Sequence, residues 1–479
     1  MTLLVISPDY ASHALPLLTI AGAWLRRGHR VVVATGPAMA PLVRQAGMEY
    51  TELIMSRGSN AGILRTRAAL DDEAQSLERF FGASREGMVA TLRYQAEQRA
   101  TDLLWRPLQV ARRTARIVEV HAPDAIIVDH LAFAASIGLR AIDVPWADVV
   151  LGHPTALPVG DEIYGVPSAW PPALNPNSIE MESLRAASRG VTEAFTHAYN
   201  ETLTRLAPGV RTVENAFAAH GDLVLYNYPS ELHGPIRTSR LPRHAFLGSA
   251  VRTEAADPDV LAWLDRPDRR PLVMVSFGTF LSRRQDVLAR VAAALRRLDV
   301  RVAMALGDGL AADLGEIPSD WLVRSSLPQV TLLERADVLV THGGNNSVTE
   351  ALNFGVPMLV MPFSTDQFDG AAAVERGLAG VALDPNHSSR PLIAGTVRGL
   401  LRNPPPSPQA IGAKLRREPG PEIAFSAMAG LRRCATPLPL LDETEPASTR
   451  PDPATAPSRG PEKPQPRRAA RRTGTAHHS

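Results

Sequence analysis

DVLVTHGGNNSVTEALNFGVPMLVMPF, residues 337–363, contains three local patterns in succession. Residues 337–341 are a short apolar run, which predicts a buried strand. Residues 347–355 have helical spacing and end in glycine, while residues 357–363 are apolar again and predict a second strand. Strand, helix and strand in this order predict a parallel βαβ unit.

The same alternation occurs in both halves of the chain. In the first half, apolar runs at residues 2–7, 30–35, 124–129 and 222–227 are separated by segments with helical spacing, and in the second half further runs lie at 271–277 and 300–306. Strands that alternate with helices predict parallel, doubly wound sheets. We therefore predict an α/β protein with two such domains and a cleft between them.

The predicted domain limits follow composition and periodicity. The first domain is placed at residues 1–235, a linker at 236–246, the second domain at 247–405, and at 406–436 a helical segment that could cross back to the first domain. Residues 437–479 are rich in Pro, Arg, Ala and Thr and cannot bury enough apolar surface to fold, so we expect a disordered tail.

Composition narrows the classes of function. The chain has 479 residues, 45% of them hydrophobic, and 51 basic against 49 acidic residues, so charge gives no argument for nucleic acid or a membrane surface. Its single cysteine, Cys434, excludes an internal disulfide framework. The only lysines are Lys414 and Lys463, which excludes Schiff-base and P-loop lysines before residue 414. Without a basic n-region or a long apolar run, we expect a cytoplasmic protein.

The turn inside the opening stretch predicts a site for an anion. Gly343 and Gly344 lie between a strand and a helix start, where free backbone N–H groups and the helix dipole attract negative charge. Ser347 and Glu350 have the spacing of a capping box. Considered alone, the same residues are also explained by a turn with a purely structural role. The flanking sequence is therefore needed to choose between an anion site and a structural turn.

The flanking sequence, residues 326–380, resembles the nucleotide-sugar signature of the UDP-glycosyltransferase superfamily, whose members have the GT-B fold of two Rossmann-like domains. The matching positions are Pro328, Gln329, His342, Gly344, Asn346, Ser347, Glu350, Gly355, Pro357, Pro362, Asp366 and Gln367. The family usually has Trp, a stacking platform for the base, where this chain has Ser326. Two further segments resemble the family: Ser276, Gly278 and Thr279 as a loop at the diphosphate, and His13 with Pro16, where Ser12 replaces a Gly.

The resemblance implies a role for each matching residue. His342 and the amides around Asn346 and Ser347 would hold the diphosphate, Glu350 the ribose hydroxyls, Asp366 and Gln367 the sugar hydroxyls, and Gln329 would lie near the base. His13 would be the general base, oriented by Asp129 at the end of a predicted strand. Asp124 competes for that role, but it precedes the strand and should lie at the opposite edge of the sheet.

These roles imply an inverting, metal-independent hexosyltransferase. It would move a hexose or deoxyhexose from a UDP- or dTDP-sugar to a hydroxyl of a small lipophilic acceptor, such as a natural product, and would need no other cofactor. Residues 54–116 and 152–176 would form the acceptor walls. The acidic pair at Asp257 and Asp259 lies near the linker and is a poor metal site.

Alternative functions remain open on the sequence alone. Residues 307–312, GDGLAA, fit a dinucleotide-binding pattern, but the acidic residue expected about 20 positions later is missing. A sugar-nucleotide epimerase of related fold, or a donor-binding auxiliary protein without transfer activity, would share the same signature. The oligomeric state and the acceptor are not defined by the sequence.

Overall fold

The computed structural model describes residues 1–56, 70–255, 257–278, 283–307 and 309–431. Thr279 and the predicted tail at 437–479 lie outside the described residues. All of the described residues belong to a single compact unit.

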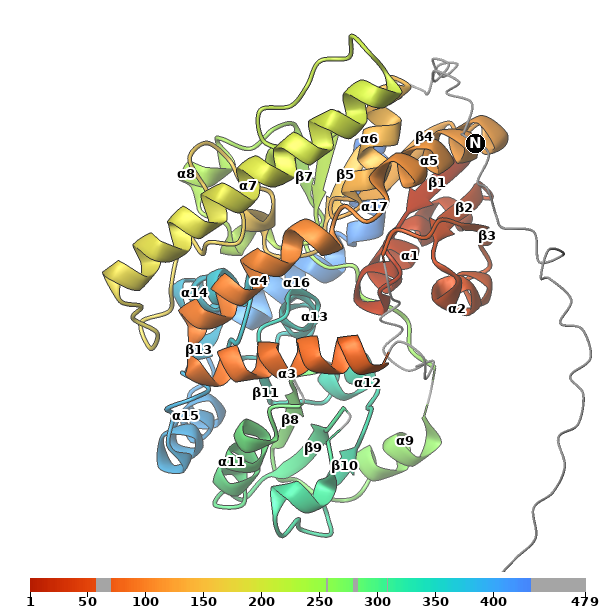
Figure 1. Cartoon of the computed structure of the whole chain (residues 1–479). Coiled ribbons are helices and arrows are strands. Elements are labelled where there is room, and N and C mark those ends of the chain that lie inside the picture. The colour runs from red at the N-terminus through yellow and green to blue at the C-terminus, as the bar shows by residue number, and fades with distance from the viewer. Residues whose placement is uncertain (57–69, 256, 279–282, 308, 432–479) are drawn as a thin grey trace, which may run out of the picture. The chain divides into compact units, whose positions relative to one another are not determined.

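The first sheet is parallel throughout and, within the described residues, has seven strands in the order β3-β2-β1-β4-β5-β6-β7 (Figure 1). Its strands are β1 (Thr2–Ile6), β2 (Arg30–Thr35), β3 (Glu49–Glu52), β4 (Ala125–Asp129), β5 (Ala147–Val150), β6 (Leu223–Tyr226) and β7 (His244–Phe246). The central strands are continuous apolar runs because helices cover both faces of such a sheet.

The second sheet is also parallel, with six strands in the part of the chain that the structure describes, in the order β10-β9-β8-β11-β12-β13. They are β8 (Leu272–Ser276), β9 (Arg301–Ala305), β10 (Leu322–Arg324), β11 (Val338–Thr341), β12 (Met358–Val360) and β13 (Gly380–Ala382). The βαβ unit predicted from the opening stretch is β11, α13 and β12, and β11 pairs with β12 in parallel.

Helices connect the strands of both sheets. In the first half they are α1 (Ala11–Leu25), α2 (Ala40–Gln45), α3 (Leu70–Glu86), α4 (Met88–Asp102), α5 (Pro107–His121), α6 (Phe133–Ala141), α7 (Ser178–Leu206) and α8 (Pro235–Thr238). In the second half they are α9 (Pro258–Leu264), α11 (Gln285–Leu295), α12 (Gln329–Leu333), α13 (Asn345–Phe354), α14 (Gln367–Arg376), α15 (Arg390–Arg402), α16 (Ser407–Arg417) and α17 (Gly420–Met428). No helix of the described parts has both the length and the apolar character needed to cross a membrane.

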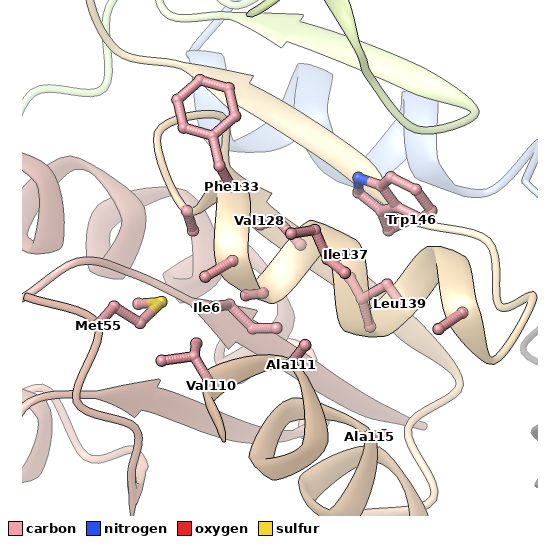
Figure 2. Packing of buried hydrophobic residues seen from close by; sticks show 14 of the residues in the cluster. Ile6, Met55, Val110, Ala111, Ala115, Val128, Phe133, Ile137, Leu139 and Trp146 are labelled. Carbon is pink, nitrogen blue, oxygen red and sulfur yellow. The ribbon is translucent and has the colours of Figure 1, made fainter. Parts of the chain in front are cut away.

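One core of the first domain lies between its sheet and the helices α5 and α6. Ile6 and Val128 from the sheet meet Val110 and Ala111 of α5 and Ile137 of α6, as Figure 2 shows. Gly138 of α6 faces the backbone of Ala111, and an added Cβ would collide with the carbonyl oxygen there. The close approach of these two helices therefore depends on glycine at that position.

The predicted linker at 236–246 is only partly irregular, because the first sheet continues into it. β7 occupies residues 244–246 and pairs with β6 in parallel. The three-residue strand His-Ala-Phe is too short to show an alternating pattern, which explains why the sequence did not predict it. The domain limits given above remain predictions.

The end of the described chain returns to the first half. α16 packs on α13, and α17 packs on α1 and β7. Ala424 and Met428 of α17 lie in the same buried cluster as Trp24 of α1. The last helix is therefore attached to the first domain by apolar contacts.

Candidate functional site

Four loops at the carboxyl ends of central strands line one cavity of ≈ 2290 Å³. In the first sheet they follow β1 and β4, and in the second sheet they follow β8 and β11. The strand order reverses between β1 and β4 in the first sheet and between β8 and β11 in the second. Open α/β sheets bind ligands at such positions. Sequence positions far apart are brought together there by topology.

His13 and Asp129 form a hydrogen-bonded pair on the first-domain side of the cavity. His13 Nδ1 lies 2.6 Å from Asp129 Oδ2, and the Asp129 side chain is fully buried at the end of β4. The backbone N–H of Leu131 donates to Asp129 Oδ1 at 2.9 Å and fixes the carboxylate. The His13 side chain is 20% exposed and lines the cavity, so its far nitrogen is the one that can meet a substrate.

The electrostatics of this pair suit a base. Burial lowers the pKa of His13, but the charge of Asp129 and the hydrogen bond to it outweigh burial, so the pKa is raised from 6.5. Burial raises the pKa of Asp129, but the His13 charge and hydrogen bond outweigh burial and hold the pKa below 3.8. A carboxylate on one ring nitrogen leaves the other to accept a proton.

His13 lies in the first turn of α1 and not in the loop before it, because the helix begins at Ala11. Pro16 lies in the interior of this helix and has no N–H to donate to the Ser12 carbonyl. Asn346 Nδ2 of the second domain donates to that carbonyl instead, at 2.9 Å. Pro16 thus frees a carbonyl acceptor through which α1, the helix of His13, is joined to the predicted diphosphate site.

The helix that follows β11 begins earlier than predicted, and the capping-box prediction is wrong. α13 starts at Asn345 with Gly344 as its N-cap, and no side chain caps it. Ser347 and Glu350 therefore lie inside the helix, where their side chains face other partners. The N-cap position is taken by glycine, which leaves the N-terminal backbone N–H groups without a side-chain acceptor of their own.

His342 lies between two glycines at this helix end. An added Cβ at Gly344 would collide with its ring, and one at Gly278, which has φ +69°, would come within 3.2 Å of His342 Cε1. Burial lowers the pKa of His342 to about 4, although a hydrogen bond to the Ser276 backbone acts in the opposite direction. Ser276, at the end of β8, and Gly278 also line the cavity.

Glu350 belongs to a charged network that also contains Gln329. Gln329 Nε2 donates to Glu350 Oε2 at 2.6 Å and to Ser347 Oγ at 3.2 Å, while Arg252 pairs with Glu350 Oε1. Arg252 also pairs with Glu254 at 2.8 Å. Burial raises the pKa of Glu350, although Arg252 and Gln329 act against it. Arg252 and Glu254 were not predicted, because nothing in the sequence separates Arg252 from the many other arginines.

Asp366 and Gln367 have different environments although they are adjacent. Asp366 lines the cavity, and its carboxylate accepts hydrogen bonds from the His153 backbone N–H and from Thr365 Oγ1. Gln367 is buried, and its Oε1 accepts the backbone N–H groups of Phe363 and Ser364 at 3.0 and 3.2 Å. Gln367 therefore holds the loop after β12, and it is not among the described residues that line the cavity.

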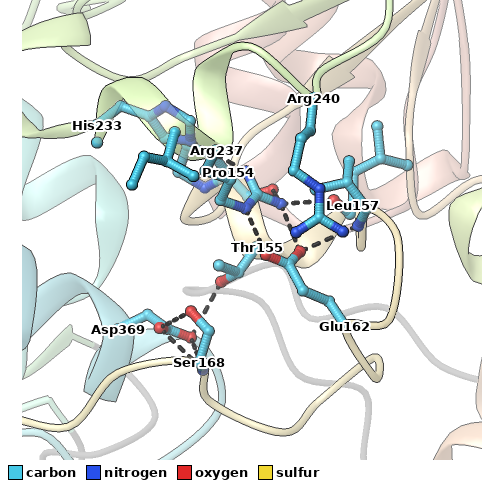
Figure 3. Close-up of polar contacts among 12 residues, drawn as sticks. Pro154, Thr155, Leu157, Glu162, Ser168, His233, Arg237, Arg240 and Asp369 are labelled. Carbon is cyan, nitrogen blue, oxygen red and sulfur yellow. Dashed lines mark hydrogen bonds and ion pairs between the residues drawn. The ribbon is translucent and has the colours of Figure 1, made fainter.

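The irregular segment 152–176 is held in place by charged side chains, as Figure 3 shows. Asp369 of α14 accepts Ser168 Oγ at 2.8 Å, the Ala169 N–H at 2.9 Å and Thr155 Oγ1 at 3.1 Å. Arg237 of α8 pairs with Glu162 at 2.8 Å. The segment predicted as an acceptor wall thus has one anchor on α14 of the second domain and one on α8, which precedes the last strand of the first sheet.

The described residues contain no group of three or more His, Cys, Asp or Glu side chains placed to hold a metal ion. Asp257 and Asp259 both pair with Arg324, at 2.9 and 3.2 Å. Asp257 in addition caps α9 by accepting the Asp259 and Val260 N–H groups. These carboxylates have structural roles.

Comparison with known proteins agrees with this architecture. Residues 217–405 match the family model described as UDP-glucoronosyl and UDP-glucosyl transferase. An uncharacterized UDP-glucosyltransferase, YojK of Bacillus subtilis (strain 168), is 29% identical over 190 residues, so the match spans 40% of this chain and about half, 46%, of that relative. The NDP-glycosyltransferase YjiC of the same organism is 25% identical over 377 residues, 78% of this chain and 82% of that protein.

The fold is shared with solved glycosyltransferase structures. The glycosyltransferase VinC in complex with dTDP has a TM-score of 0.62 at 17% identity, covering 90% of this chain and 98% of that one. The second half matches the family in sequence, and nearly the whole described chain matches in fold. Residues 217–405 are therefore similar in sequence to the UDP-glycosyltransferase family, and the described chain has the GT-B fold.

Proposed function

We propose that the protein is an inverting glycosyltransferase that moves a hexose or deoxyhexose from a UDP- or dTDP-sugar to a hydroxyl of a small lipophilic acceptor. One observation carries the proposal: His13, which is hydrogen-bonded to Asp129, and the uncapped start of α13 line the same cavity. A base on one side and an anion seat on the other are the two groups that a displacement at an anomeric carbon needs.

The reaction follows from this placement. His13 Nε2 takes the proton of the acceptor hydroxyl while its oxygen attacks the anomeric carbon and forms the new C–O bond. The bond from that carbon to the phosphate oxygen breaks on the opposite face, so the configuration inverts. Asp129 stabilises the imidazolium that forms.

The leaving nucleoside diphosphate would meet the N-terminus of α13. The backbone N–H groups there and the helix dipole stabilise the negative charge that develops on the phosphate oxygens. His342 is neutral in the free protein, so it would contribute a hydrogen bond and not a full charge unless the bound phosphate raises its pKa. This seat supports a reaction that uses no metal ion.

The remaining residues would hold the rest of the donor. Glu350 would contact the ribose, and Gln329 would lie near the base. Asp366 would contact the sugar hydroxyls, and Ser276 and Gly278 the diphosphate. Gln367 would act through the loop that it holds. Apolar residues on the first-domain side of the cavity support a lipophilic acceptor; they include Leu15, Leu18, Leu42, Leu103, Leu131 and Leu151.

The test is transfer from UDP- and dTDP-sugars to a panel of hydroxylated acceptors, followed by mass spectrometry. His13→Ala should lower transfer by about 10²–10⁴-fold, the usual contribution of a general base. Nucleoside diphosphate binding, measured by calorimetry, should stay close to that of the unchanged protein. His197→Ala, at an exposed position of α7, is the matched control.

Each alternative function predicts a different result in this assay. Undiminished transfer by His13→Ala would disprove the base assignment. Conversion of the sugar nucleotide without any acceptor would identify an epimerase. Donor binding with no transfer to any acceptor would favour an auxiliary protein.

A further inference from the structure

His130 is a buried imidazole that the reaction above does not use. It follows Asp129 directly, its side chain is 3% exposed, and it lines the cavity. Its backbone N–H donates to the Val149 carbonyl at 3.1 Å. Neither ring nitrogen has a hydrogen-bond partner in the described structure.

The surroundings of the ring do not meet its hydrogen-bonding needs. Its Nδ1 lies 3.8 Å from Asp129 Oδ1, beyond hydrogen-bond distance. The ring also lies near the Val149 carbonyl, but without the geometry of a hydrogen bond. An unpaired polar group costs stability when it is buried, so an apolar side chain would serve the fold better at this position.

The location of His130 indicates what could pair with it. Its ring is close enough to His13, Asp129 and Asp366 for their charges to act on it. Burial lowers the pKa of His130, so the ring is neutral and offers one donor and one acceptor. It therefore lies at the reacting centre, on the first-domain side that carries the base.

We propose that His130 hydrogen-bonds an oxygen of the acceptor next to the hydroxyl that His13 deprotonates. The acceptor class is therefore one with vicinal oxygens, such as a 1,2-diol, a catechol or an α-hydroxy carbonyl compound. This inference rests on the proposed function and deepens it. The same chemistry is present in the 2-hydroxyl of a donor sugar, but the position of His130 beside Asp129 favours the acceptor.

A matched pair of probe acceptors tests the inference. 7,8-Dihydroxycoumarin has two adjacent hydroxyls and 7-hydroxycoumarin has one. For the unchanged protein and for His130→Leu, kcat/KM is measured for both acceptors with one active donor. We expect His130→Leu to lower kcat/KM for the dihydroxy acceptor about tenfold more than for the monohydroxy acceptor, because only the dihydroxy acceptor loses a hydrogen bond. The variant and the unchanged protein are compared on the same acceptor, so the intrinsic reactivity of each acceptor cancels.

Two further variants separate binding from structure. His130→Gln keeps a donor and an acceptor and should restore part of the preference. His197→Leu, on the exposed face of α7, should leave the preference unchanged. The thermal midpoint of His130→Leu should not fall, since the variant removes an unpaired buried group.

The outcomes that overturn the inference are distinct. An equal loss for both acceptors would assign His130 a structural role. A loss that disappears when the donor is a 2-deoxy sugar would assign the hydrogen bond to the donor. If the unchanged protein transfers sugar to the monohydroxy acceptor, the proposed function stands whatever happens to His130, and if it transfers to no acceptor, both proposals fail.

Discussion

His13 and Asp129, the proposed base and its partner, are 116 positions apart in sequence, and their hydrogen-bonded atoms are 2.6 Å apart in the structure. The family resemblance singled out both residues, and the expectation that they lie close together rests on their positions after predicted strands, whose carboxyl ends share one edge of a parallel sheet. The sequence could not predict the direction in which the pKa values move, because these depend on burial of the ring and the carboxylate.

The raised pKa of His13 predicts the pH dependence of transfer. Only the neutral ring accepts a proton, so kcat/KM should fall as pH drops through a pKa that lies above 6.5. Asp129→Asn removes the charge that raises this pKa while burial still lowers it. The acid limb of the pH profile should therefore move to lower pH, and the plateau should fall by about 10²–10⁴-fold. An acid limb that stays in place would show that Asp129 does not set the His13 pKa.

Arg252 and Glu350 illustrate what residue patterns cannot show. The spacing of Ser347 and Glu350 fits a capping box, and local sequence gives no reason to reject it. The structure rejects it because Gly344 starts the helix, which turns the Glu350 carboxylate toward Arg252. A buried carboxylate needs a partner, but the identity of a partner 98 positions away follows from the tertiary fold alone.

At the scale of elements, the start of α14 has three separate roles, of which the sequence predicted one. The signature at Asp366 and Gln367 predicts contacts to a sugar. In the structure Asp366 faces the cavity, Gln367 holds the preceding loop, and Asp369 one turn later anchors the segment 152–176. Burial raises the pKa of Asp369 to about 6, with the hydrogen bonds from Ser168, Ala169 and Thr155 acting in the opposite direction.

Removing this anchor should destabilise the acceptor wall. Asp369→Ala leaves the Ser168 and Ala169 N–H groups without their acceptor, which should lower the free energy of unfolding by about 3 kcal/mol. Proteolysis should then cut the segment 152–176 more readily, and KM for the acceptor should rise more than KM for the donor. Asp161→Ala is the control, because Asp161 lies in the same segment with a side chain that is 96% exposed. Equal effects of the two substitutions would contradict the anchoring role.

At the scale of the whole molecule, the alternation of strands and helices predicts two parallel sheets, and the structure confirms both. The sequence does not predict how segments cross between them. Phe80 and Phe81, from the segment predicted as an acceptor wall, lie in a buried cluster with Phe277 and Phe363 of the second half. Such long-range packing carries no local periodicity that could have revealed it.

The path of the last helix also depends on packing between distant segments. Phe425 of α17 packs edge-on against Trp24 at 5.0 Å, and the Arg27 guanidinium lies 4.1 Å from its ring centroid. Glu422 pairs with Arg26 and Arg27. These contacts hold α17 on α1, the helix that carries His13, while the preceding helix α16 packs on α13. α16 and α17 therefore connect the proposed anion seat to the proposed base.

Weakening the contacts between α17 and α1 should reduce sugar transfer but leave nucleotide binding almost unchanged. Phe425→Ala should lower the free energy of unfolding by about 1–3 kcal/mol through lost apolar and aromatic contacts. Because the predicted nucleotide seat lies on the second sheet, the Kd of UDP or dTDP should change little, whereas kcat for transfer should fall as His13 loses its fixed distance to the anomeric carbon. Ser426→Ala, at an exposed position of the same helix, should alter neither quantity. If Phe425→Ala weakened nucleotide binding as much as transfer, α17 would be supporting the second domain itself and not the alignment of base and donor.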